Sequence, residues 1–159
     1  MSIRLQPSDK AIDFKLLGDD NKEHTLKEFL GSKLILYFYP RDNTSGCTRE
    51  AVEFSDYYEE IKKLGAEVIG ISPDSINSHK KFKEKHGIKF LLLSDPDKKV
   101  AESYGAFGEK KMYGKITKGI IRSTFIIDEN GVVIKSFYNV KVNGHVEKVL
   151  KILKGLANE

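Results

Sequence analysis

The chain has 159 residues, of which 40% are hydrophobic and 31% are charged, and its formal net charge is +4. This length fits one domain, 1–159, that can bury a core, and no run of about 18 apolar residues is present that could span a membrane. The lysines alternate with acidic residues, as in KKFKEKHGIK, without a cluster of aromatic residues. We therefore expect neither a nucleic acid nor a membrane as a partner.

Cysteine and histidine usage narrows the chemistry further. The segment MSIRLQPSDK has no apolar core and is not typical of a signal peptide. Cys47 is the only cysteine, so it cannot form a disulfide within the chain. Both features predict a cytoplasmic protein, in a compartment that keeps thiols reduced. The four histidines are dispersed and lack the spacing of metal ligands, so we expect no metal and no cofactor.

The first part of the chain predicts two strands separated by a short helix. Phe14–Leu17 is the first strand. Thr25 and Glu28 match a capping box for a helix that continues through Phe29. Leu34–Tyr39 is a wholly apolar run, which is typical of a strand that is buried on both faces.

The next segment alternates helix and strand. Apolar residues recur at steps of three and four along Cys47–Leu64, which predicts a long helix. Ala66–Ile71 predicts a further strand. Another helix follows, capped by Ser75 or Ser78 and ended by Gly87.

A strand, a helix and a loop come next. Phe90–Leu93 predicts the strand. Asp95 followed by Pro96 predicts a helix start, with proline at the first helical position, and the helix continues to Tyr104. Gly105–Gly119 shows no clear period, and we interpret it as a loop long enough to be functional.

An antiparallel hairpin and a helix close the chain. Ile120–Ile127 predicts a strand that includes Arg122. Asn130–Gly131 predicts a tight turn into a second strand, Val132–Tyr138. Asn143 is expected to cap the last helix, which carries an apolar stripe. The whole pattern indicates an α/β fold, with a central mixed β-sheet flanked by helices on both faces and a site at the C-terminal end of a strand.

Cys47 occupies a special place in this pattern. The buried strand is ended by Pro40, a short polar loop follows, and the next helix begins near Cys47. Backbone N–H groups in the first turn of a helix lack intrahelical acceptors, and the macrodipole adds about half a positive charge, so this position favours a thiolate. A lone cysteine is more often an inert buried side chain. The proline, the helix start and Thr44 together indicate a reactive one instead.

A peroxide suits such a thiolate. The sulfur attacks one oxygen and the other oxygen leaves, and both need hydrogen-bond donors while charge moves across the O–O bond. The hydroxyl of Thr44 and the backbone N–H groups near Gly46 and Cys47 can supply donors. A cation would complete the site.

The segment YFYPRDNTSGCTRE resembles the active-site motif of the peroxiredoxins through Pro40, Thr44, Gly46 and Cys47. It is most similar to the Q-type group, also called bacterioferritin comigratory proteins, and the similarity extends over VIGISPDS, FLLLSDPDKKVAESYG and RSTFIIDENG. The resemblance implies a thioredoxin-like fold and a thiol-dependent peroxidase. It also implies that Pro40 shields the thiolate and that Arg122 stabilises the thiolate and donates to the peroxide.

Three further positions qualify this resemblance. Glu50, one turn after Cys47, either orients Arg122 or is only a charge near the helix start. Ser45 stands where the motif usually has proline, which should loosen the loop without removing a reacting group. Val52 stands where Q-type members often have a resolving cysteine.

Without a resolving cysteine, the resemblance implies a one-cysteine peroxidase. Hydrogen peroxide or an organic hydroperoxide would oxidise Cys47 to a sulfenic acid, and an external thiol would reduce it through a mixed disulfide. Thioredoxin, glutaredoxin and a small thiol are alternative reductants, and both a monomer and a homodimer fit. The alternative function is a non-enzymatic redox sensor or binding module on the same fold.

Overall fold

The computed structural model describes residues 4–157, which form a seven-stranded mixed sheet and a separate two-stranded one. The order of strands in the larger sheet is β2-β1-β5-β4-β3-β8-β9. Their bounds are β1 Lys15–Gly18, β2 Glu23–Thr25, β3 Lys33–Phe38, β4 Ala66–Ser72, β5 Leu91–Ser94, β8 Ser123–Ile127 and β9 Val133–Phe137. β3, β4 and β5 pair in parallel and the remaining pairs are antiparallel, so the predicted mixed sheet is confirmed.

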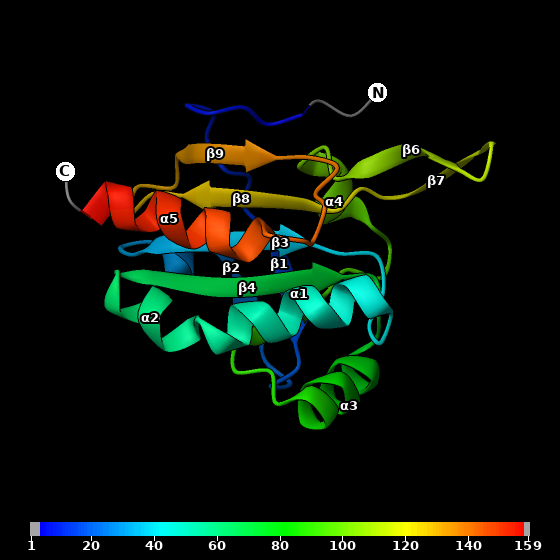
Figure 1. Cartoon of the computed structure of the whole chain (residues 1–159), viewed down its shortest axis with the longest axis horizontal. Helices are drawn as coiled ribbons and strands as arrows, with labels where there is room; N and C mark the ends of the chain where they lie inside the picture. The colour runs from blue at the N-terminus through cyan, green and yellow to red at the C-terminus, as the bar shows by residue number, and fades with distance from the viewer. Residues whose placement is uncertain (1–3, 158–159) are drawn as a thin grey trace.

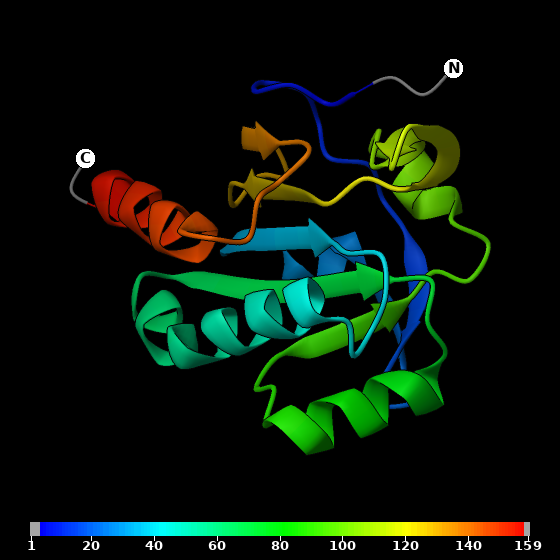
Figure 2. The same ribbon diagram turned by 45° about the vertical axis from the view of Figure 1, so that its right-hand side comes forward.

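Helices cover both faces of this sheet, as predicted. One face packs against α1 (Ser45–Asp56), α2 (Tyr58–Lys63), α3 (Ile76–His86) and α5 (His145–Ala157). The N-terminal segment, the 3-10 helix η1 (Leu26–Phe29) and α4 (Lys99–Ser103) cover the other face. Figure 2 shows α1 and α5 side by side against the sheet. No helix within the described residues is long and apolar enough to cross a membrane.

β3 is the central strand of the core. Leu34, Leu36 and Phe38 pack into the cluster on one face of the sheet. Ile35 and Tyr37 pack into the cluster on the other. Burial on both faces explains why this strand is a continuous apolar run rather than an alternating one. Because β3 lies between β4 and β8, its C-terminal end opens at the middle of the sheet.

The predicted helix Cys47–Leu64 is two helices instead of one. α1 begins at Ser45 and ends at Asp56, and α2 starts after a break at Tyr57. The change of direction lets the Tyr58 hydroxyl donate to Glu67 of β4 at 2.7 Å. A tertiary contact therefore overrides the helical period, which is continuous across the break.

The helix predicted after Thr25 is present as η1, which ends at Phe29 as expected, but its capping box does not form. Thr25 makes no side-chain cap to η1, and Glu28 pairs with the ring of His24 instead of with the backbone. The predicted start of the helix at Asp95 is wrong. α4 begins later than predicted. Asp95 lies four residues before the first residue of α4, and its carboxylate accepts from the N–H of Ala101 in that helix at 2.9 Å.

The remaining turn signals have mixed outcomes. α3 is capped as predicted, since Ser75 accepts from the N–H of Ser78 at 3.2 Å and Gly87 ends the helix with a left-handed φ of 64°. The Asn130–Gly131 turn joins the antiparallel strands β8 and β9. Asn143 does not start α5, which begins at the second residue after it, because its side chain accepts from an arginine of α1.

The segment Gly105–Gly119 is a hairpin, not a loop. β6 (Phe107–Met112) and β7 (Lys115–Ile120) pair antiparallel and project from the main sheet in Figure 1. Tyr113 and Gly114 form the turn with φ values of 53° and 77°, as a tight two-residue hairpin requires. β7 is largely exposed, and both strands carry lysines and a glycine, so they lack the alternation that would have predicted them.

The predicted strand Ile120–Ile127 is interrupted. β7 ends at Ile120 and β8 begins at Ser123, so Arg122 lies between two strands rather than within one. Its carbonyl oxygen accepts from the N–H of Val140 at 3.0 Å instead of from a neighbouring strand. The chain passes here from the hairpin into the main sheet.

His145, the first residue of α5, is buried in the contact between α1 and β9. Its Nε2 atom is 2.8 Å from the Thr124 hydroxyl, and its ring packs against the edges of Phe54 and Phe137. Burial, with the positive charges of Lys148 and Arg122, lowers the pKa of His145 from 6.5 to about 4. The folded protein therefore holds this imidazole neutral.

The pKa of His145 predicts that stability falls with acidification. In the unfolded chain His145 binds a proton below about pH 6.5, whereas in the folded chain it binds this proton only below about pH 4. The free energy of unfolding should therefore lose about 3 kcal/mol over this interval. Urea unfolding at several pH values checks this, with His145→Gln expected to flatten the decline. An equally steep decline in the variant would contradict it.

Candidate active site

Cys47 is the third residue of α1 and is 1% exposed. The N–H of Thr48 makes a helical hydrogen bond to the Thr44 carbonyl at 2.9 Å. The N–H groups of Gly46 and Cys47 lie in the first turn of α1, where no carbonyl of the helix can accept from them. The positive end of the helix therefore lies at the thiol, as the sequence predicts.

Arg122 joins the thiol to a buried carboxylate. Its Nη2 donates to the Sγ atom of Cys47 at 3.3 Å, and its Nη1 donates to Oε1 of Glu50 at 2.8 Å. The Arg122 side chain is 17% exposed and that of Glu50 is completely buried. The structure thus brings together three of the predicted site residues, from α1 and from the segment between β7 and β8.

The charges of this group depend on one another. Burial alone would lower the pKa of Arg122, but Glu50 and Cys47 raise it above its ordinary value. Burial raises the pKa of Glu50 to about 7, although Arg122 opposes the shift. The second oxygen of Glu50 is buried without a hydrogen-bond partner among the described residues. The guanidinium is therefore always charged, whereas Glu50 titrates near neutral pH.

Close packing against Arg122 favours a glycine at position 46, in addition to the backbone donor role predicted for Gly46. A Cβ atom at this position would come within 3.2 Å of Nη2 of Arg122. The guanidinium therefore lies against the bare backbone of the first helical turn. A larger residue would push Arg122 away from the sulfur of Cys47.

Thr44 and Pro40 lie in the loop between β3 and α1. Thr44 precedes α1, and its hydroxyl donates to the carbonyl of Arg41 at 2.9 Å. Among the described residues it makes no hydrogen bond to Cys47. Pro40 is partly buried and follows β3 closely. Donation by Thr44 and shielding by Pro40 stay predictions.

Lys110 is a second cation whose charge interacts with Cys47 and Arg122, and the sequence did not indicate it. It lies on β6 with its side chain against Gly119, partly buried. Burial and Arg122 lower the pKa of Lys110, while Cys47 raises it. The sequence did not indicate which residues Lys110 would contact. Gly105–Gly119 was interpreted as a loop, and a loop gives no prediction of the direction in which a side chain points.

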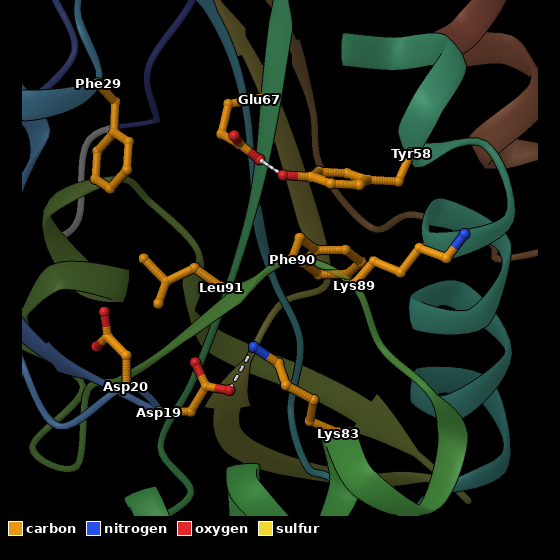
Figure 3. A pocket seen from close by; sticks show the side chains of 9 residues that line it. All are labelled: Asp19, Asp20, Phe29, Tyr58, Glu67, Lys83, Lys89, Phe90 and Leu91. Atoms are coloured by element: carbon orange, nitrogen blue, oxygen red, sulfur yellow. Dashed lines mark hydrogen bonds and ion pairs between the residues drawn. The ribbon is translucent and has the colours of Figure 1, made fainter.

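A surface pocket of about 390 Å³ lies at the opposite end of the parallel strands. Figure 3 shows Lys83 paired with Asp19 in this pocket, and the Tyr58 hydroxyl paired with Glu67. Its lining comes from the starts of β4 and β5, whereas Cys47 follows the end of β3. The pocket is therefore separate from the reactive thiol.

Comparison with known proteins agrees with the geometry of the site. Residues 7–136 match the AhpC/TSA family. The putative peroxiredoxin bcp of Helicobacter pylori is 50% identical over 150 residues, which cover 94% of this chain and 99% of that protein. Peroxiredoxin Bcp of Bacillus subtilis is 44% identical over 157 residues, which cover 99% of this chain and all of that protein.

Solved structures show the same fold. Peroxiredoxin Q of Xanthomonas campestris superposes with a TM-score of 0.87 at 38% identity and 98% coverage of both chains. A cysteine-to-serine variant of PrxQ from Xylella fastidiosa gives a TM-score of 0.90 at 35% identity and 99% coverage of both.

The thioredoxin-like sheet, with a cysteine at a helix start beside a buried arginine, defines the class of thiol peroxidases. The chain belongs to the AhpC/TSA family, and within it to the Q-type, or Bcp, peroxiredoxins. It is thus a thiol-dependent peroxidase, with a peroxide as substrate and a thiol as reductant. Its only cysteine is Cys47.

The pKa of Glu50 predicts a pH-dependent effect of its removal. We expect Glu50→Gln to lower the rate constant of peroxide reduction about tenfold above pH 8, where ionised Glu50 holds Arg122. The ratio of wild-type to variant rates should shrink below about pH 7, since protonated Glu50 is as neutral as glutamine. Competition kinetics across this range measures the ratio.

The matched control is Glu53→Gln on the same helix, since Glu53 pairs with Arg49 rather than with Arg122. Its ratio should stay near one at every pH. A ratio for the Glu50 variant that does not change with pH would contradict the assignment.

Proposed function

We propose that Cys47 is the residue that reduces hydrogen peroxide and organic hydroperoxides. The observation that carries this proposal is the 3.3 Å hydrogen bond from Arg122 to its sulfur. The thiolate attacks one peroxide oxygen and the O–O bond breaks, which leaves a sulfenic acid on Cys47. The other oxygen departs as hydroxide or alkoxide and takes up a proton, giving water or an alcohol.

The other site residues stabilise the negative charge as it moves from the sulfur to the departing oxygen. Arg122 favours the thiolate and donates to the peroxide, together with Thr44 and the backbone N–H groups near Gly46. Glu50 holds the guanidinium in place through its 2.8 Å hydrogen bond. Pro40 shields the sulfur from solvent. Alkyl peroxide reduction activity of the bacterioferritin comigratory protein of Xanthomonas campestris supports the inclusion of organic hydroperoxides.

The second half of the cycle needs another molecule. With one cysteine in the chain, an external thiol displaces water from the sulfenic acid to form a mixed disulfide, and a second thiol then releases Cys47. Thioredoxin, glutaredoxin and a small thiol all have this chemistry, and a reducing cytoplasm supplies it. No step requires a nucleic acid, a membrane or a cofactor, and one domain, 1–159, suffices as a monomer or a homodimer.

Replacement of the sulfur tests the proposal directly. Cys47→Ser should abolish peroxide consumption in the presence of dithiothreitol, because a hydroxyl is not ionised at neutral pH. Stopped-flow measurement of peroxide, with circular dichroism to show that the variant is folded, checks this. Residual consumption at the wild-type rate would exclude Cys47. A wild-type protein that reacts once but does not turn over would instead be a redox sensor.

The missing second cysteine predicts sensitivity to excess peroxide. With no internal thiol to trap the sulfenic acid, Cys47 should proceed to sulfinic and sulfonic acid, which intact mass spectrometry detects as added oxygens. Val52→Cys should protect Cys47 by forming a disulfide. Residues five apart in a helix are separated by about 7.5 Å along its axis, so the first turn of α1 must unwind for this bridge.

A matched control for this experiment is Val52→Ser, which introduces a similar volume without a thiol. It should over-oxidise like the wild type. A wild-type protein that gains no oxygens under excess peroxide would contradict the one-cysteine cycle.

A further inference from the structure

A buried polar network lies behind the loop that leads to Cys47. Its centre is the side chain of Asp42, which is 1% exposed. The carboxylate accepts from the Tyr39 hydroxyl at 2.7 Å, from the Ser78 hydroxyl at 2.8 Å and from Nδ1 of His79 at 2.7 Å. Asp42 lies in the six-residue loop between β3 and α1, and it is fixed by Tyr39 of the same loop and by α3.

The network extends to the ends of two further strands. The N–H of Asp42 donates to Asp74 at 2.7 Å, and the hydroxyl of Ser72 donates to the same carboxylate oxygen at 2.6 Å. The Nε2 atom of His79 is 2.9 Å from the carbonyl oxygen of Leu93. The loop is therefore tied to the C-terminal ends of β4 and β5 as well as to α3.

The hydrogen bonds place a proton on one ring nitrogen of His79. Nε2 faces a carbonyl oxygen, which only accepts, so Nε2 carries a proton. Nδ1 faces a carboxylate oxygen of Asp42 that already accepts from a hydroxyl. The 2.7 Å separation of Nδ1 from that oxygen requires one proton between the two atoms, carried by the nitrogen or by the oxygen. In both arrangements His79 and Asp42 form one buried hydrogen-bonded pair.

A metal ion is the competing explanation for this cluster. Ligand atoms of Asp42, Asp74 and His79 lie within 4.8 Å of one another. Each of the carboxylate oxygens concerned, however, already accepts hydrogen bonds from two donors. The hydrogen bonds of Nδ1 with Asp42 and of Nε2 with Leu93 engage both ring nitrogens of His79. The geometry therefore favours a hydrogen-bonded pair over a metal site.

The loop held by this pair carries part of the active site. Asp42 lies between Pro40 and Thr44, and the loop turns sharply after it, since Asn43 has a left-handed φ of 63°. Asparagine adopts this conformation more readily than most other residues, so it suits a sharp turn at this point of the loop. The first turn of α1, with Cys47, follows directly.

We propose that Asp42 and His79 are a positioning pair for the peroxidase reaction. They contact neither the sulfur nor the peroxide. The pair fixes the loop so that Thr44 and the start of α1 keep their places relative to Cys47. This role rests on Cys47 being the peroxide-reducing residue.

The test compares two reactions of Cys47: with hydrogen peroxide, which needs aligned donors, and with iodoacetamide, which does not. His79→Gln keeps much of the volume and can still reach Leu93, but it removes the donor to Asp42. We expect the rate constant with hydrogen peroxide to fall about tenfold or more, because small misplacements of reacting groups cost large factors in rate. Alkylation of Cys47 by iodoacetamide, which needs no aligned donors, should change less than about twofold.

Two further variants sharpen the result. Asp42→Asn should show the same split between the two reagents, and Tyr39→Phe, which removes one hydroxyl donor, should show a smaller one. His86→Gln is the matched control, because His86 lies on α3 but packs against Phe82 outside the network. Its rates with both reagents should equal those of the wild type.

Nuclear magnetic resonance of the wild-type protein supplies a test without any variant. Nitrogen-15 spectra of the ring of His79 should show a proton on Nε2, which faces a carbonyl oxygen, and a hydrogen bond at Nδ1. An Nε2 atom without a proton, or wild-type peroxide rates in a folded His79→Gln protein, would overturn the proposal. Peroxide consumption by Cys47→Ser would instead overturn the assignment of Cys47, so the two failures are distinguishable.

Discussion

A buried guanidinium is the constraint on which the site depends. Arginine does not lose its proton in a protein, so the charge of Arg122 must be matched by negative groups nearby. α1 supplies both, since Glu50 and Cys47 are three residues apart and share one face of the helix. Burial raises the pKa of Glu50 to about 7, so its carboxyl group is only partly ionised at neutral pH. The sulfur of Cys47 is the second group that accepts a hydrogen bond from the guanidinium.

The rest of the fold brings these groups to one place. β3 is buried on both faces and ends at the middle of the sheet, so the loop after it has little freedom. Arg122 enters from the gap between β7 and β8, where the chain is free of strand pairing and its side chain can turn toward α1. The bare backbone of Gly46 lets the guanidinium approach closely.

Local patterns in the sequence predicted the parts that local physics controls. The apolar run of β3, the helix start near Cys47 and the Asn130–Gly131 hairpin are each encoded by neighbouring residues. The β6–β7 hairpin was missed because each of its strands carries lysines and a glycine, which removes the alternation that marks a strand. The capping box at Thr25 failed because Glu28 pairs with His24 of the adjacent strand.

Contacts between distant segments were beyond the reach of such patterns. Arg122 was identified through a family resemblance, and its place outside the strands was not foreseen. The pairing of Asp42 with His79 spans 37 positions and joins a loop to a helix that are not neighbours in sequence. No spacing rule relates two such residues, so each looked like an ordinary surface position or a core side chain.

The separation of Cys47 from Arg122 also orders events during synthesis. The two residues are 75 positions apart, and β3 pairs with β8, which follows Arg122 directly. A growing chain therefore contains Cys47 well before Arg122 has been translated. Until β8 docks on β3, the hydrogen bond from Arg122 to the sulfur of Cys47 cannot form. The contact at the centre of the site is therefore made only after most of the chain has been synthesised.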